Sequence, residues 1–266
     1  AHQIAFAAHA GAEAPLRKGP SEFEINFSYL KTARSVDNQV PYWNIVAHSQ
    51  NSAILHYTVL ETQSPDESRR FLIDAGASFH GYAADITRTY AQAENDFARM
   101  IEAVDALTLS LADTLKPGLS YVSIHELAHD GIAQILHDFG IVNLSPRKIV
   151  ETGISKTFFS HGIGHFLGLQ VHDVGGHVRD DSGTPNPAPA AHPFLRCTRT
   201  IEAGHVYTIE PGLYFIDSLL AKLKDTPDSV YINWDRIDEF RPFGGIRVED
   251  NVIVHATHNE NMSRPS

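Results

Sequence analysis

Cysteine is nearly absent from this sequence: Cys197 is the only one among 266 residues. A single thiol forms no internal disulfide and cannot build a zinc site from several thiolates. Long hydrophobic runs are also missing, and no segment approaches the roughly 20 apolar residues that a membrane-spanning helix needs. We therefore expect no membrane partner, and we interpret Cys197 as an ordinary buried side chain.

Basic residues are scarce as well, since 21 Lys and Arg stand against 32 Asp and Glu, for a formal charge of -11. A negatively charged protein repels phosphate backbones, so the composition argues against a nucleic-acid partner. It also leaves room for carboxylates that bound cations neutralise. The chain lacks an initiating Met and a signal-peptide pattern and opens within a predicted helix, so we expect it to be part of a longer protein, about whose targeting this absence says little. We expect that protein to be cytoplasmic.

The residue pattern predicts helices and hairpins in alternating groups. Residues 1–18 are typical of a helix, and Ser21 with Glu24 forms a capping box for a second helix ending near Arg34. Apolar residues at steps of three or four predict long helices over 94–115 and 122–139. Strands are predicted over 44–47, 53–57, 70–76, 81–90, 206–212 and 245–254, with further short strands from about 158 and an extended loop over 180–193. This order favours an α+β fold in one domain, 1–266.

Five positions place an acid or an imidazole among apolar residues: Asp74, Asp85, His165, Glu210 and Glu249. An isolated buried carboxylate is unfavourable unless it is paired or bound to a metal ion. Asp74 and Asp85 stand 11 residues apart on the two arms of a predicted hairpin, so they can face each other. The sequence therefore predicts two divalent metal ions. Carboxylates with one imidazole suit Mn²⁺, with Co²⁺ or Zn²⁺ as alternatives.

Neighbouring polar residues fit the same interpretation. Arg88 and Arg247 are too few to neutralise four acids. Strand alternation predicts Arg247 on the face of Glu249 and Thr87 on the face of Asp85, where each would orient a carboxylate.

The segment His161–His165 carries two histidines four residues apart, as the helical HExxH motif of zinc proteases does. Gly162 stands where that motif has Glu, and two glycines disfavour a helix, so we reject the motif. Together with His172, these histidines indicate a turn-based site instead.

Six strings of residues together resemble those of the "pita-bread" metallopeptidases, over essentially the whole chain. The similarity is greatest to the bacterial prolidase (Xaa-Pro dipeptidase) family, including the branch called organophosphorus acid anhydrolase. The strings are Leu72–Gly76, Gly81–Thr89, His161–His165, Leu169–Asp173, Thr208–Gly212 and Gly245–Asp250. The resemblance implies a curved antiparallel sheet flanked by helices, in two pseudo-symmetric halves.

The resemblance also implies metal-binding roles. Asp74 would chelate one ion, and His165 and Glu210 the other. Asp85 and Glu249 would bridge both. Glu210 would in addition act as general base and then general acid, taking a proton from the attacking water and passing it to the prolyl nitrogen.

Other residues match substrate-side positions of the family. His172 would contact the substrate carbonyl and stabilise the tetrahedral intermediate, and Arg196 would bind the terminal carboxylate. His161 would line the site and is expected to be a catalytic residue with Glu210 and His172. The remaining residues would contact the substrate or line its small pocket: His56, Tyr42, Val171 and Arg247.

The implied activity is hydrolysis of Xaa-Pro dipeptides, with phosphotriesters as plausible side substrates. Alternatives are aminopeptidase P, methionine aminopeptidase and a non-catalytic pita-bread binding module. The segment Leu195–Arg199 favours prolidase, and retention of all five ligands argues against the module. Family members carry a preceding N-terminal domain that helps form a homodimer; it is missing here, so we expect the full-length protein to be the dimer.

Overall fold

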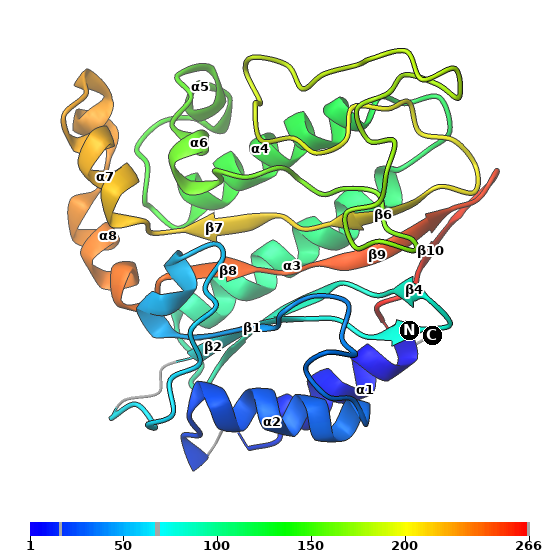
Figure 1. Cartoon of the computed structure of the whole chain (residues 1–266). Coiled ribbons are helices and arrows are strands. Elements are labelled where there is room, and N and C mark those ends of the chain that lie inside the picture. The colour runs from blue at the N-terminus through cyan, green and yellow to red at the C-terminus, as the bar shows by residue number, and fades with distance from the viewer. Residues whose placement is uncertain (16–17, 67–69, 265–266) are drawn as a thin grey trace.

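The structure, a computed structural model, describes residues 1–15, 18–66 and 70–264. Antiparallel strands run through the middle of the molecule, and helices lie on both sides of them (Figure 1). Two halves follow each other along the chain, each with two leading helices and a three-stranded antiparallel sheet. The predicted α+β architecture in two halves is therefore confirmed.

The first half has the strand order β1-β2-β5, with two helices packed below it in Figure 1. Its elements are α1 (His2–Glu13), α2 (Glu22–Ala33), β1 (Ile45–His48), β2 (Arg70–Ala75) and β5 (Ile86–Ala91). The predicted capping box of Ser21 and Glu24 is present. Helix α1 ends at Glu13, earlier than the predicted residue 18, because Pro15 has no N–H to continue the helical hydrogen bonds.

The second half has the strand order β10-β9-β6, and helix α3 packs across its strands. Its main elements are α3 (Asp96–Thr114), α4 (Tyr121–Asp138), β6 (Val206–Ile209), β7 (Gly212–Tyr214), β8 (Gly245–Arg247), β9 (Asp250–Val254) and β10 (Asn259–Asn261). Shorter elements are β3 (Ser78–Phe79), β4 (Tyr82–Ala83), α5 (Pro146–Glu151), α6 (Ser155–Phe158), α7 (Asp217–Lys224), η3 (Pro227–Tyr231), α8 (Trp234–Phe240) and η4 (Arg241–Phe243). The two predicted long helices are confirmed as α3 and α4.

Two predicted strand regions are wrong. Residues 53–57 do not form a strand, since a 3₁₀ helix, η2 (Ser49–Ala53), and a turn occupy this part of the chain. The hydroxyl of Ser52 donates to the Ser49 carbonyl and holds this tight turn. Between 159 and 205 the structure has only isolated bridges, because glycines with positive φ, such as Gly164 and Gly175, turn the chain repeatedly.

Three further predicted strands form, but each is interrupted at an acid. Asp85 lies between β4 and β5, Glu210 between β6 and β7, and Glu249 between β8 and β9. A side chain at such a break leaves the regular alternation of a strand, so the breaks aim these acids differently from their neighbours. Within the described residues, none of the helices combines the length and the apolar character of a membrane span.

A buried glutamate fixes helix α2 to β1 and to the segment that follows β1. Glu22 is fully buried at the start of α2. Its carboxylate accepts hydrogen bonds of 2.7–2.9 Å from four donors: His48 N, Asn51 Nδ2, Tyr57 Oη and Glu61 N. One carboxylate therefore holds β1, η2 and the segment after it against α2.

We expect Glu22→Ala to lower the free energy of unfolding by about 3–5 kcal/mol, because it leaves several buried donors unpaired. Glu24→Ala, which removes only the capping box of the same helix, should cost about 1 kcal/mol. Urea unfolding of both variants measures the difference. Equal losses would show that Glu22 acts merely through the helix terminus.

Candidate active site

The five predicted ligand residues converge in the structure from both halves of the chain. Asp74 comes from β2, and the other acids stand at the three strand breaks. Ligand atoms of Asp85, His165 and Glu249 all lie within 4.8 Å of one another. His165 Nε2 is 3.5 Å from Asp85 Oδ2 and 3.6 Å from Glu210 Oε1. We call these five residues the acidic cluster.

Asp74 has one satisfied oxygen and one that is not. Arg247 Nη2 donates to Asp74 Oδ2 at 2.5 Å. Asp74 Oδ1 is buried and has no hydrogen-bond partner among the described residues. A buried carboxylate oxygen without a donor is costly, and a cation is the natural partner for it.

Arg247 and Thr87 orient the cluster, although each bonds a different acid from the one that alternation predicted. Thr87 Oγ1 donates to Glu249 Oε2 at 2.7 Å. Arg247 is buried, and its remaining donors reach Tyr214 Oη at 3.0 Å and Thr87 Oγ1 at 3.3 Å. The partners differ because the strand breaks remove the regular alternation. Because these bonds occupy its guanidinium, Arg247 orients Asp74 and Thr87.

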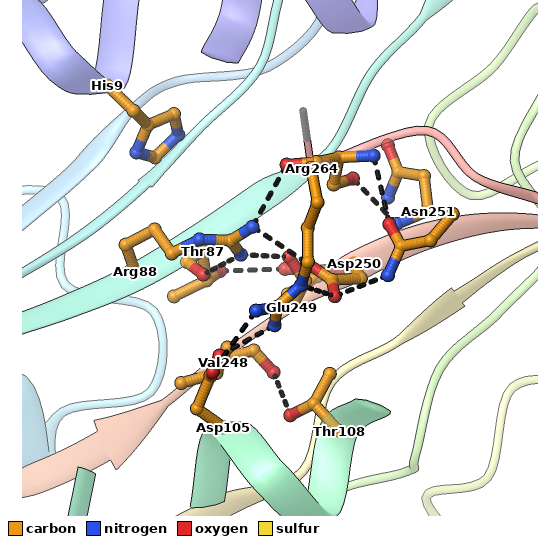
Figure 2. Close-up of polar contacts among 12 residues, drawn as sticks. His9, Thr87, Arg88, Asp105, Thr108, Val248, Glu249, Asp250, Asn251 and Arg264 are labelled. Atoms are coloured by element: carbon orange, nitrogen blue, oxygen red, sulfur yellow. Dashed lines mark hydrogen bonds and ion pairs between the residues drawn. The ribbon is translucent and has the colours of Figure 1, made fainter. Parts of the chain in front are cut away.

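A polar network fixes the backbone that carries Glu249. Figure 2 shows Arg88 and Arg264 both reaching Asp250, at 2.7 Å and 2.5 Å. Arg88 also donates to the Glu249 carbonyl at 2.7 Å, and the Glu249 amide donates to the Thr87 carbonyl at 3.0 Å. These bonds join β5 of the first half to β9 of the second, directly beside the cluster.

His165 is held in the orientation that a metal ligand needs. Its Nδ1 lies 2.9 Å from the Phe166 carbonyl, so with the proton on Nδ1 the lone pair of Nε2 faces the acids. Its backbone N–H donates to Thr208 Oγ1 at 3.0 Å. The preceding Gly164 has φ +155°, and a Cβ there would lie 2.2 Å from the Thr208 carbonyl. Only glycine allows His165 to approach β6 this closely.

Electrostatics inside the cluster favour bound cations. Burial raises the pKa of Glu249 well above its ordinary value, and the neighbouring acids raise it further. Burial also raises the pKa of Asp74 to about 6 and that of Glu210 to about 7. Burial acts in the same direction on Asp85, but its hydrogen bond with His165 and the charge of that ring hold the pKa of Asp85 below its ordinary value. Acids this close and this buried need added positive charge to ionise together.

The donor set therefore fits divalent metal ions: carboxylate oxygens, one oriented imidazole, and a buried oxygen without another partner. Asp74, Asp85, His165, Glu210 and Glu249 are the residues that would hold them.

A pocket of about 400 Å³ opens beside the cluster, and its lining includes His165, His172 and Arg196. The ring of His172 meets that of His165 edge-on, with centroids 4.4 Å apart. Burial, followed by the charges of His165 and Arg196, lowers the pKa of His172 to about 4. His172 is thus a neutral imidazole at neutral pH, able to donate one hydrogen bond into the pocket.

His161 lies beside Glu210. Its Nε2 is 3.0 Å from Tyr214 Oη, and its Nδ1 is 3.7 Å from Glu210 Oε2. Burial and, to a smaller extent, the positive charge of Arg247 lower the pKa of His161 to about 3. His56 is exposed, and its charge lowers the pKa of both His161 and His172, which puts it in electrostatic range of both rings.

The two predicted wall residues occupy different surroundings. Tyr42 Oη donates to Asp85 Oδ1 at 2.5 Å, so Tyr42 contacts the cluster itself. Val171 is half-buried next to His172 and is not among the residues that line the pocket.

Two residues of this site were not predicted from the sequence. Tyr214 joins Arg247 to His161 through its hydroxyl. Asn251 accepts from the Asp85 amide at 2.9 Å and donates to the Asp85 carbonyl at 2.5 Å, which ties the two halves together at an acid. The sequence did offer one signal for these residues: Tyr214 lies four positions after Glu210, and Asn251 lies two positions after Glu249.

Comparison with known proteins agrees with this geometry. The model of metallopeptidase family M24 matches residues 1–256. Proteins named Xaa-Pro dipeptidase from Pseudoalteromonas atlantica and Shewanella denitrificans are 63% identical over 268 residues and 54% identical over 264 residues. Each match covers 99% of this chain and 60% of the relative, so the chain spans about three-fifths of their length.

Solved structures of Escherichia coli aminopeptidase P are similar in fold. The zinc-substituted form in complex with product has a TM-score of 0.76, and the low-pH form 0.77, both at 29% identity. Both matches cover 99% of this chain and 53% of the other chain. The pita-bread fold predicted from the resemblance is thereby confirmed. The sequence match over nearly the whole length leads to one conclusion: the chain belongs to metallopeptidase family M24.

Proposed function

We propose that the chain is the single catalytic domain of a dinuclear-metal hydrolase that cleaves Xaa-Pro dipeptides. The observation that carries this proposal is the acidic cluster, with its unpartnered Asp74 oxygen, beside a pocket that Arg196 and His172 line. The relatives named Xaa-Pro dipeptidase support the substrate class. Retention of all five ligand residues argues against a non-catalytic binding module.

The cluster would bind two divalent ions, Asp74 holding one, His165 and Glu210 the other, and Asp85 and Glu249 both. Mn²⁺ suits a site that carboxylates dominate, and Co²⁺ or Zn²⁺ are the alternatives. Bound there, the ions lower the pKa of water and polarise the substrate carbonyl.

Glu210 is placed to move the proton. Its side chain is 16% exposed, against 13% for Asp74 and 7% for Asp85, so of these three carboxylates it is the most accessible to solvent. It would take a proton from the attacking water and pass it to the prolyl nitrogen. His161 Nδ1 lies 3.7 Å from Glu210 Oε2, so the two side chains are neighbours at the site.

His172 and Arg196 would bind the two ends of the reacting group. As a neutral imidazole, His172 donates a hydrogen bond to the carbonyl oxygen, which strengthens as negative charge develops there. The exposed guanidinium of Arg196 lines the same pocket and can pair with a terminal carboxylate through two parallel hydrogen bonds. His56, Tyr42 and Val171 would complete the walls, with Arg247 behind the carboxylates.

A dipeptide is the substrate that this arrangement favours. The prolyl peptide bond is a tertiary amide without an N–H, so recognition has to use the carbonyl and the carboxylate. A longer peptide has no carboxylate at that position, which separates this proposal from the aminopeptidase P alternative that the structural matches raise. Phosphotriesters are proposed only as side substrates of the same activated water.

The proposal extends to the setting of the full-length protein. We propose a cytoplasmic homodimer whose dimer contacts come from sequence outside this chain, since the relatives are longer than the matched region.

Glu210→Gln should lower kcat for an Xaa-Pro dipeptide by about a hundredfold or more, because the amide cannot accept the proton. Metal content has to be measured on the same sample, so that loss of an ion is distinguished from loss of the base. Glu102→Gln, on the exposed surface of α3, is the matched control and should keep full turnover. Wild-type turnover in Glu210→Gln would end this assignment.

Arg196→Met should raise KM for an Xaa-Pro dipeptide about 10- to 100-fold, since it removes a charged pair worth about 1.5–3 kcal/mol. KM for the corresponding Xaa-Pro amide, which lacks the carboxylate, should change little. Arg179→Met, an exposed arginine outside the pocket lining, is the control. Equal effects on dipeptide and amide would contradict carboxylate binding and favour longer substrates.

Chelation should destabilise the protein, because the buried acids lose their counter-charge. Saturating Mn²⁺ at about a hundred times its Kd should add about 2.7 kcal/mol, which corresponds to a rise in Tm of roughly 5–10 °C. Differential scanning fluorimetry and elemental analysis measure Tm and ion content, with about two equivalents expected per chain. A Tm indifferent to chelator and Mn²⁺, with no ion retained, would support the binding module.

A further inference from the structure

A second group of potential metal ligands lies outside the acidic cluster, where α4 meets the long loop before Arg196 (Figure 1). It consists of His125, His129 and His192, and we call it the histidine triad. One nitrogen of each ring lies within 4.8 Å of the nitrogens of the other two. Tetrahedral zinc with bonds of about 2.0–2.1 Å needs nitrogens roughly 3.4 Å apart, so small side-chain movements would close the shell.

The local sequence matches a known zinc-binding pattern. His125 and His129 are one turn apart on α4, so they project from the same face of the helix. The residues from 125 to 129 are His-Glu-Leu-Ala-His, the HExxH arrangement that binds zinc through its two histidines on a helix. Unlike the segment His161–His165, this one has the glutamate and forms the helix that the pattern requires.

Hydrogen bonding leaves the imidazoles available as ligands. His129 Nδ1 is 3.1 Å from Ser155 Oγ, an orienting contact that leaves Nε2 free. His125 Nδ1 is buried without a hydrogen-bond partner among the described residues. The ring of His125 meets those of His192 and His129 edge-on, with centroids 4.5 Å and 4.7 Å apart, and the rings of His129 and His192 stack at 5.5 Å, so the three side chains pack against one another.

The charges around the triad keep it in the ligand form. Burial, followed by the neighbouring histidines, lowers the pKa of His125 to about 2. Burial and the charges of His192 and Lys156 lower the pKa of His129 to about 4. Neutral imidazole is the form that binds zinc, so binding at neutral pH displaces no proton from these rings. Lys156 opposes a cation, whereas Glu126 favours a positive charge at His192.

We propose that His125, His129 and His192 bind one zinc ion, which fixes the loop of residues 180–196 to helix α4. Three imidazoles suit zinc better than manganese, and they leave a fourth position for water. His192 starts the turn in which the Leu195 N–H donates to the His192 carbonyl at 3.1 Å, and Arg196 follows directly. The ring of Phe159 contacts His125 and His129 on one side and His161 on the other, so the triad adjoins the active site without sharing a ligand with it.

The test separates the triad from the acidic cluster by disabling the cluster. In the Asp85→Asn/Glu249→Gln protein we expect one equivalent of zinc to remain after dialysis, measured by elemental analysis and by competition with a chelator. Adding His192→Gln should weaken this binding by more than the ~10–100-fold that loss of an orienting group costs. His258→Gln, an exposed histidine distant in sequence, should leave it unchanged.

Three further measurements keep the proposal open to refutation if the cluster variant fails to fold. In the otherwise unchanged protein, His192→Gln should lower total bound zinc by one equivalent, and Lys156→Gln should tighten binding about two- to fivefold by removing an exposed opposing charge. Zinc should also slow tryptic cleavage after Arg179 in the loop, and His192→Gln should abolish that protection. Zinc binding that His192→Gln leaves unaltered would overturn the proposal, and so would absence of zinc uptake. Both outcomes are independent of peptidase turnover.

Discussion

The repulsion between buried carboxylates is the constraint on which this structure depends. Asp74, Asp85, Glu210 and Glu249 gather in a region where burial alone already raises the pKa of each acid's side chain or acts in that direction. Arg247 contributes one positive charge and reaches only Asp74 directly. The fold therefore holds together a group of acids that is unfavourable by itself, and bound cations turn that cost into affinity.

The rest of the protein serves to prevent these acids from moving apart. Asn251 of β9 bonds both backbone groups of Asp85, and Arg88 of β5 bonds the carbonyl of Glu249 (Figure 2). Each contact crosses from one half of the chain to the other, at a break in a strand. Because a break frees the backbone from the sheet ladder, it lets a side chain point across the sheet instead of along the regular pleat. The interruptions are thus the feature that builds the site.

The same interruptions mark the limit of what the sequence could predict. The periodicity of apolar residues predicted α3 and α4, and the capping box predicted the start of α2. Both signals are local in the sequence. The acids were recognised by their apolar neighbours, which is also a local signal. The sequence could not predict the acids that Thr87 and Arg247 bond, because strict alternation of side chains fails where a strand breaks. The loop over 180–193 was predicted, because its Pro, Gly and Ser residues are a local signal. The short strands predicted from about 158 were wrong, because glycine-rich turns and their long-range contacts decide the path of that segment.

This division of the chain also separates two kinds of chemistry. Asp74 lies on β2, and Asp85, Glu210 and Glu249 lie at strand breaks, where contacts between the two halves fix the backbone of Asp85 and Glu249. His172 and Arg196 stand on a loop without regular strands, whose path depends on turns and on its contacts with α4. In the proposed function, the loop would select among substrates, and the acids at the strand breaks would hold the ions that activate water. The chain can therefore share its fold with aminopeptidase P and still have a sequence more similar to Xaa-Pro dipeptidases. The shared fold reflects the sheets, whereas the sequence identity also includes the loop.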